Sequence, residues 1–484
     1  MKSETLILVL VNLAGIMERA DESLLPGVYK EVGAALHTDS TGLGSLTLLR
    51  SIVQSLCYPL AMYLAVRHNR THVIVLGAFL WAAATFLVGF SSTFFQVAVS
   101  RGLNGIGLAM VQPAIQSLVD DSTEDHNQGI VFGWIQLTGN LGSMLSVLLA
   151  STSFYGIAGW RIAFHLVALV SIIVGIVVRL YGKDSRFVEK NCVDGDSSTG
   201  KSLQLKEFFK EAKSVMKIPT FQIVVSQGVT GSFGGAASAF IPLWLEVIGF
   251  SHKETAFLMS MYPVACSIGG LFGGKMGDIL SVRLPNSCRI ILSQISAVSF
   301  IPLAWILQLG LPYDPSTAFK HGLVLFIIGL FTSWNAPSTN NAIFAEIVLV
   351  RSRTSIYALD QSFENILASF APPVVGLLSQ HVFGYRPAPQ GSSQSAEVET
   401  DRKNAASLAK ALYASIAIPF TICVLVYSFM YCTYLRDRDR GKMKALIESE
   451  MEQLESQKVL MDGKYSQIQA SKVYEKETVI ELDY

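Results

Sequence analysis

Long apolar stretches, separated by short polar breaks, recur along most of the chain. A helix that crosses a membrane needs about 20 mainly apolar residues, because each residue adds about 1.5 Å of rise. Segments of this kind are predicted at 5–32, 43–66, 72–91, 94–119, 129–151, 159–182, 218–247, 254–280, 289–310, 320–346, 355–380 and 407–435. The pattern therefore predicts an all-α membrane protein with twelve transmembrane helices.

Charged residues gather in two segments, which together hold 34 of the 74 charged residues. The first of them divides the predicted helices into two sets of six, and such six-helix halves are one known transporter architecture. A weak repeat supports the division, because Gln136 and Asn140 have the same spacing as Gln361 and Asn365. We expect an N-terminal bundle at 1–182, a cytoplasmic linker at 183–217, a C-terminal bundle at 218–435 and a cytoplasmic tail at 436–484.

The distribution of Lys and Arg predicts the orientation of the chain in the membrane. With both termini in the cytoplasm, most of the basic loop residues lie on the cytoplasmic side, as the positive-inside rule requires. The apolar stretch Leu6–Met17 after Lys2 could instead form a signal peptide, but no clear cleavage pattern follows it. We expect a first spanning helix here, and no address signal identifies which membrane holds the protein.

Composition excludes several classes of protein. Only 15% of the residues are charged and the net charge is zero, so a basic face for nucleic acid is not expected. No phosphate-binding loop or hydrolase motif occurs, which argues against an ATP-driven pump and an enzyme. The six cysteines have no metal-ligand spacing. We expect no enzyme activity, no cofactor and no metal site.

Five acidic residues lie inside predicted helices and away from the helix ends. Glu18, Asp21 and Glu22 share one face of the first helix, and Asp360 and Glu364 are one turn apart in the eleventh. A charged group within a bilayer is costly, so it usually faces the bundle interior or a cavity. These acids are our candidates for proton coupling. The alternatives are a first helix that ends before Glu18, and a purely structural network around Asp360.

Three arginines accompany these acids in the predicted helices. Arg19 lies beside the acids of the first helix, and Arg101 opens the fourth helix in an apolar context. We expect both to serve as charge partners of the acids. Arg50 is expected to extend toward the membrane interface.

Uncharged amides suit a neutral or zwitterionic solute, although most of them could instead bond between helices. The candidates for the substrate cavity are Asn12, Gln112, Gln116, Gln136, Asn140, Gln227, Asn335, Asn340 and Asn341.

Two motifs resemble the major facilitator superfamily. One is the segment Arg101–Gly107, with the sequence RGLNGIG, and the other is Gly274–Asp278 followed by Arg283. The resemblance implies the major facilitator fold, with helices 1, 4, 7 and 10 around a central cavity and gating loops. Arg67, Arg70, Gly274, Asp278 and Arg283 are the gating-loop candidates. Val66 stands where the family usually has Asp.

Residues 12–22, the Arg101 segment and Gly159-Trp160-Arg161 are most similar to the spinster-like branch of that family. This similarity implies an amphiphilic, lipid-like solute, whereas the amides favour a polar organic one. We expect a monomeric secondary active transporter in the lipid bilayer, working by alternating access and coupled to protons. The alternative is a solute sensor that does not transport, which the Val66 departure and the long tail would suit.

Overall fold

The computed structural model describes most of the chain, and every regular element in the described part is helical. The described residues are 3–67, 69–122, 138, 139, 141–143, 145, 146, 150, 158–181, 213–284, 286–334, 341–348, 353–386, 394–444, 446, 447, 449–451 and 454. Eight helices among them are long and apolar enough to cross a membrane. The predicted span 129–151 lies mostly outside the described residues.

The first half of the chain supplies six of the described helices. They are α1 (Ser3–Gly27), α2 (Tyr29–Leu36), α3 (Ser40–Arg67), α4 (Arg70–Phe90), α5 (Phe94–Ser122) and α7 (Gly159–Tyr181). Pro26 and Gly27 end α1, and the short helix α2 ends at His37, whose φ of 48° is left-handed. The predicted segment 5–32 is therefore two helices joined by a bend.

The second half is more segmented, because several predicted spans consist of helical pieces in series. The elements are α10 (Pro219–Ala237), η2 (Ser238–Phe240), α11 (Ile241–Ile248), α12 (His252–Arg283), α13 (Cys288–Trp305), η3 (Ile306–Gly310), η4 (Pro315–Thr317), α14 (Ala318–Thr332), α15 (Asn341–Ile347), α16 (Arg353–Ala368), α17 (Ala371–Leu377), η7 (Leu378–Val382) and α18 (Gln394–Ser428). Pro372 and Pro373 stand in the first turn of α17, after the break that ends α16.

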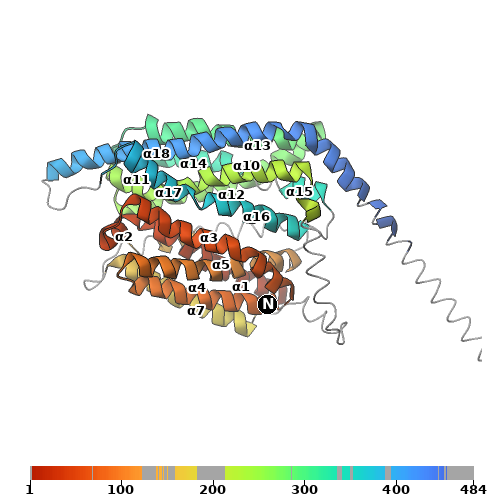
Figure 1. The fold of residues 1–484 in the computed structure, drawn as a ribbon, viewed down its shortest axis with the longest axis horizontal. Helices are drawn as coiled ribbons and strands as arrows, with labels where there is room; N and C mark the ends of the chain where they lie inside the picture. Colours follow the sequence, from red (N-terminus) through yellow and green to blue (C-terminus); the bar gives the residue numbers. More distant parts are fainter. Residues whose placement is uncertain are drawn as a thin grey trace, which may run out of the picture.

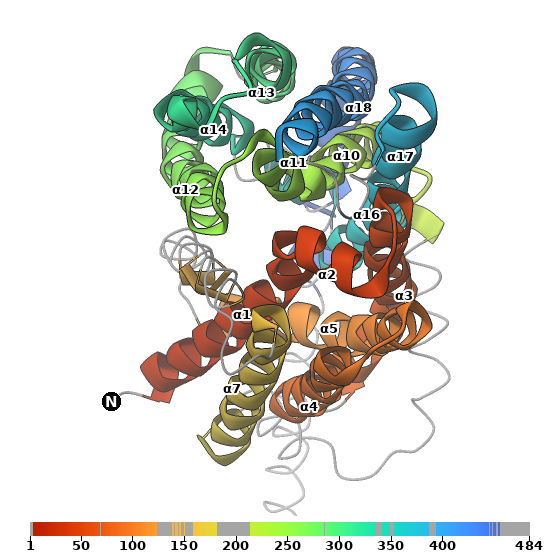
Figure 2. The same ribbon diagram turned by 90° about the vertical axis from the view of Figure 1, so that its left-hand side faces the viewer.

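The helices form two groups that lie side by side. In Figure 1 the red to yellow helices α1–α7 lie below the green to blue helices α10–α18, and the long helices run in nearly the same direction. Helices α2, α11 and α17 lie at one end of the molecule, which we call the α2 end. Figure 2 views the molecule from this end and shows α2 between the two groups.

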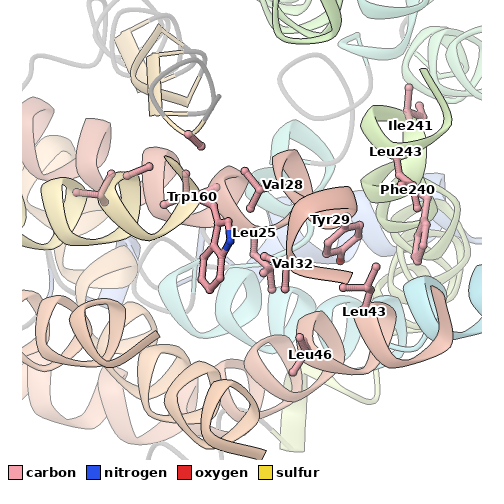
Figure 3. Close-up of a cluster of buried hydrophobic side chains, with 14 of the residues drawn as sticks. Leu25, Val28, Tyr29, Val32, Leu43, Leu46, Trp160, Phe240, Ile241 and Leu243 are labelled. Atoms are coloured by element: carbon pink, nitrogen blue, oxygen red, sulfur yellow. The ribbon is translucent and has the colours of Figure 1, made fainter. Parts of the chain in front are cut away.

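An apolar cluster joins the two groups at the α2 end. Leu25, Tyr29 and Leu43 from the first half pack in one buried cluster with Phe240 and Leu243 from the second half (Figure 3). The rings of Tyr29 and Phe240 have centroids 5.2 Å apart. Burial of these side chains stabilises contact between the halves, because each contributes roughly 1.5–3 kcal/mol when fully removed from water.

Close backbone approach strengthens the same contact. A Cβ on Gly44 of α3 would lie 2.6 Å from the backbone nitrogen of Pro373, and one on Gly376 would lie 2.7 Å from Thr41 Cα. The side chains of Thr41 and Gln380 form a hydrogen bond of 2.9 Å across the halves. Glycine is required at both positions, since any side chain would separate α3 from α17.

Two polar segments differ from the sequence-based expectation. The motif Gly274–Asp278 lies within α12, which continues to Arg283, so it is part of a helix end and not of a free loop. Residues 430–444 are helical, and Asp437 accepts hydrogen bonds from the amide and hydroxyl of Thr220 at 3.0 and 2.8 Å. The start of the predicted tail therefore packs on α10, because Asp437 satisfies donors at the first turn of that helix.

Candidate functional site

The acidic residues of α1 lie inside a continuous helix. Because α1 extends to Gly27, the alternative in which it ends before Glu18 is wrong. Glu18 and Asp21 are buried, with 7% and 0% exposure, whereas the side chain of Glu22 is 35% exposed. The three acids share one helix face, but their surroundings differ.

Asp21 is the counter-charge of the buried Arg101. A guanidinium nitrogen of Arg101 lies 3.7 Å from Asp21 Oδ2, and neither side chain is exposed. Thr85 Oγ1 and Asn104 Nδ2 donate hydrogen bonds to Asp21 at 2.5 and 2.9 Å. Within the described part of the chain, the guanidinium nitrogens of Arg101 have no hydrogen-bond partner. Asp21 therefore offsets the Arg101 charge where α1, α4 and α5 meet.

Glu22 pairs with two arginines from two helices. Its carboxylate accepts hydrogen bonds from Arg19 at 3.1 Å and from Arg50 at 3.0 Å. Arg50 is only 5% exposed, so the expectation that it extends to the membrane interface is wrong. The carboxylate of Glu22 lies within its reach, and an ion pair in the bundle compensates the guanidinium charge there.

Glu18 belongs to a chain of polar side chains that joins α1, α3 and α5. Gln112 donates a hydrogen bond to Glu18, and the Tyr58 hydroxyl donates one to the oxygen of Gln112. Gln54 donates to the same oxygen at 3.3 Å. This chain provides hydrogen bonds without a second full charge, so Glu18 is held differently from Asp21 and Glu22.

The acids of the second half are not compensated in this way. Asp360 and Glu364 lie one turn apart on α16, and no ion pair to either occurs within the described residues. Asp360 is 5% exposed, and its Oδ1 is buried with no described hydrogen-bond partner. Two carboxylates in this arrangement repel each other when both are ionised.

Glu364 occupies a space that glycine provides. Ser232 of α10 donates a hydrogen bond to Glu364 Oε2 at 3.0 Å. A Cβ on Gly228 would collide with Glu364 Oε1, so glycine at that position leaves room for the carboxylate where it lies. Gly228 therefore allows the Glu364 carboxylate to lie against the backbone of α10.

A cavity of about 330 Å³ lies within the second half, between α10, α12, α13, α14, α16 and α18. Its walls include apolar side chains such as Phe300, Ile328 and Phe420, and Glu364 lies on it. No Lys or Arg is among the described residues that line it. The size and the largely apolar lining are typical of pockets that bind small organic molecules.

Two buried amides present unused hydrogen-bonding groups at this cavity. Gln308 of η3 and Gln227 of α10 both line it and are 0% and 1% exposed. In the part of the chain that the structure describes, the side-chain oxygen and nitrogen of Gln308 and the side-chain nitrogen of Gln227 have no hydrogen-bond partner. Buried polar groups are normally satisfied, so these amides are suited to bind a polar group or water in the cavity.

The remaining candidates are placed only in part. Asn12 accepts a hydrogen bond from Thr138 Oγ1 at 2.7 Å. Arg70 begins α4 and is buried, and Arg283 ends α12 and is exposed. The backbones of Arg67, Gln116, Gly274, Asp278 and Asn341 lie in helices, while the side chains of the four non-glycine residues lie outside the description. Gln136, Asn140, Asn335 and Asn340 lie outside the described residues.

Several participating residues were not predicted from the sequence. Thr85, Tyr58 and Ser232 are common types whose partners lie in other helices, so their spacing carries no signal. Gln308 stands alone in the apolar run Ile306–Gly310, and a lone polar residue of this kind is a detectable signal.

Comparison with known proteins gives the family. The model of the Major Facilitator Superfamily matches residues 11–372. An MFS-type efflux pump of Mycolicibacterium smegmatis is 24% identical over 439 residues, which are 89% of this chain and 92% of the pump. The cis,cis-muconate transport protein of Acinetobacter baylyi is 22% identical over 298 residues, which are 60% of this chain and 69% of that protein.

Solved structures support the fold. A bacterial homologue of the human lysosomal transporter Spinster, in an inward-facing and unoccupied conformation, has a TM-score of 0.70 and 18% identity. The alignment covers 90% of this chain and 99% of that one. A D-xylose–proton symporter has a TM-score of 0.62 and 12% identity, over 87% and 97% of the two chains. The chain belongs to the Major Facilitator Superfamily and is a multi-pass membrane transporter, which confirms the sequence-based expectation that it is not an enzyme.

Proposed function

We propose that this protein moves an organic solute by alternating access, with twelve spanning helices in two six-helix bundles and both termini in the cytoplasm. The described helices lie at the predicted apolar segments, and residues 129–151 would complete the first bundle. The halves are in contact at the α2 end through Tyr29, Phe240 and their neighbours. In this orientation the α2 end is outside, so the described conformation is closed to the outside.

We propose that the solute is a neutral or cationic amphiphile that binds in the cavity of the second half. The observation that carries this proposal is a carboxylate, Glu364, on a largely apolar cavity whose described lining includes no Lys or Arg. Gln227 and Gln308 add hydrogen-bonding groups. A dicarboxylate such as the muconate named for one relative would be repelled by Glu364, whereas a substrate of an efflux pump with a cationic group would be attracted.

Proton coupling would use the same carboxylates. Binding of one proton by Asp360 or Glu364 removes their mutual repulsion, and binding of a cationic solute does so as well. The two therefore compete for the same negative charge, which favours exchange of a proton for a cation. A neutral solute would instead enter together with the proton.

The first half would link protonation to the packing of its helices. Protonation of Glu18 or Glu22 changes the hydrogen bonds to Gln112 and Arg50 that join α1 to α5 and α3, as well as the bond to Arg19 within α1. Asp21 has a different role in this proposal, because it offsets the fully buried Arg101. Its protonation would leave a charge uncompensated, so we assign it to the stability of the bundle.

The first prediction concerns Glu364→Gln, which keeps the shape of the side chain and removes its charge. It is expected to abolish pH-gradient-driven flux of tetraphenylphosphonium in proteoliposomes, because the cavity can then no longer exchange a proton for the cation. Asp439→Asn, at an acid that is 69% exposed, is the control and should leave the flux unchanged.

Cis,cis-muconate is the comparison solute, and wild-type protein should not transport it. Gradient-driven muconate flux, or undiminished cation flux in Glu364→Gln, would contradict the proposal. Binding of the cation without any counterflow in wild-type protein would instead support the alternative function, a solute sensor that does not transport.

The second prediction uses Gly228→Ala. The added methyl group would displace the Glu364 carboxylate, and loss of a charged interaction of about 1.5–3 kcal/mol should weaken tetraphenylphosphonium binding roughly 10- to 100-fold. The matched control is Gly231→Ala, on the same helix and cavity, where the nearest atom is Cys423 Sγ at 3.8 Å. Wild-type affinity in both variants, measured by equilibrium binding, would show that the described position of the Glu364 carboxylate is not needed for binding.

The third prediction separates stability from transport. Asp21→Asn leaves the buried Arg101 without a counter-charge, which should lower the free energy of unfolding by about 3–5 kcal/mol. Asp21→Asn combined with Arg101→Met should recover part of this loss, because the uncompensated charge is removed. Thermal unfolding of detergent-purified protein provides the measurement. A single variant as stable as the wild type would show that Asp21 is not the required counter-charge.

A further inference from the structure

Three potential metal ligands from separate parts of the chain converge at the α2 end. Glu31 lies on α2 of the first half, and Glu246 and His252 lie on α11 and α12 of the second half. His252 Nδ1 is 2.6 Å from Glu246 Oε1 and 3.4 Å from Glu31 Oε1. One ligand atom from each residue lies within 4.8 Å of the other two. We call these residues the Glu–Glu–His cluster.

The local fold holds two of these residues against each other. Gly249 ends α11 with a φ of 113°, a left-handed conformation that favours glycine. Ser251 then begins α12 in a capping box with Glu254. This turn brings Glu246 and His252 face to face, and their side chains are only 6% and 13% exposed. The pair is thus formed by a short turn between two capped helix ends, and both side chains are largely buried.

The third residue completes the set from the opposite half. The Glu31 side chain is 35% exposed, but its Oε2 is buried and has no hydrogen-bond partner among the described residues. Lys30 directly precedes Glu31, and Lys253 directly follows His252. In the described part of the chain, neither lysine forms a salt bridge with the cluster. The cluster therefore brings two carboxylates and one imidazole together, and the nearby charge of Lys30 acts on Glu31 without a described salt bridge.

We propose that the Glu–Glu–His cluster binds a divalent transition-metal ion of the zinc class. Zinc takes imidazole nitrogen and carboxylate oxygen at about 2.0–2.2 Å, so neighbouring ligand atoms of a tetrahedral site lie about 3.4 Å apart. The distance from His252 to Glu31 already has this value, and that from His252 to Glu246 must widen by less than about 1 Å. Water would take the fourth position, as in other sites with three protein ligands.

A bound ion would connect the two halves of the protein. The cluster lies at the same end as the apolar contact between Tyr29 and Phe240, and its ligands come from both halves. Metal coordination would hold this end closed, because opening requires α2 to separate from α11 and α12. The metal would therefore inhibit transport. This consequence rests on the proposed function, whereas the proposal that the cluster binds metal is independent of it.

The first test is zinc binding by purified full-length protein. Isothermal titration should show one site in the wild type, and zinc should raise the temperature of unfolding while magnesium does not. Glu31→Gln and His252→Gln should each weaken binding at least about tenfold. His381→Gln is the matched control, because His381 is an exposed histidine in η7 near the same end. Unchanged zinc affinity in Glu31→Gln and His252→Gln would overturn the site.

The second test measures inhibition of solute counterflow by zinc added on the side of the α2 end. Wild-type protein should be inhibited and Glu31→Gln should be resistant, since that variant lacks the only cluster ligand from the first half. Zinc that binds the wild type without slowing counterflow would overturn the closing role. Failure of the proposed transport function can be distinguished from failure of the metal site. In that case wild-type protein would show no counterflow even without zinc, but its zinc binding would still depend on Glu31.

Discussion

The structure depends on the compensation of charges that are buried among apolar helices. A charge in such surroundings is costly unless an opposite charge, hydrogen bonds, a proton or water offsets it. The first half largely meets this requirement internally, because Asp21 offsets Arg101 and Glu22 pairs with Arg50 and with the partly exposed Arg19. The pairs made by Arg50 and Arg101 connect α1 with α3 and α5, so the charges that would destabilise single helices instead fix their arrangement.

The second half leaves the requirement unmet at one place. Asp360 and Glu364 have no described cation, and the amides of Gln227 and Gln308 present unsatisfied groups at the same cavity as Glu364. A ligand or a proton can complete these interactions, and this is the physical basis for placing solute and proton at one site. In the proposed function, the first half therefore has a supporting role and the second half binds the solute, although the two halves resemble each other in their predicted helices.

Much of the fold could be predicted from the sequence, because the thickness of the bilayer sets the length of apolar run that a spanning helix needs. The apolar pattern could not show the breaks between α1 and α2 or between α10 and α11. It also could not show that α18 begins at Gln394, because polar turns beyond the bilayer extend a helix without lengthening its apolar run. The acids were visible as charges in apolar runs. Their partners Thr85, Tyr58 and Ser232, and the meeting of Glu31 with His252, depend on packing between distant segments, which single-residue patterns do not encode.

The central claim is that a solute and a proton share the negative charge at Glu364. It is tested most directly by titrating tetraphenylphosphonium into weakly buffered, purified protein and recording proton release with a pH indicator. The account predicts release of roughly one proton per bound cation, because binding and protonation are linked through the same group. Saturable binding of the cation with no release of protons at any pH would contradict it.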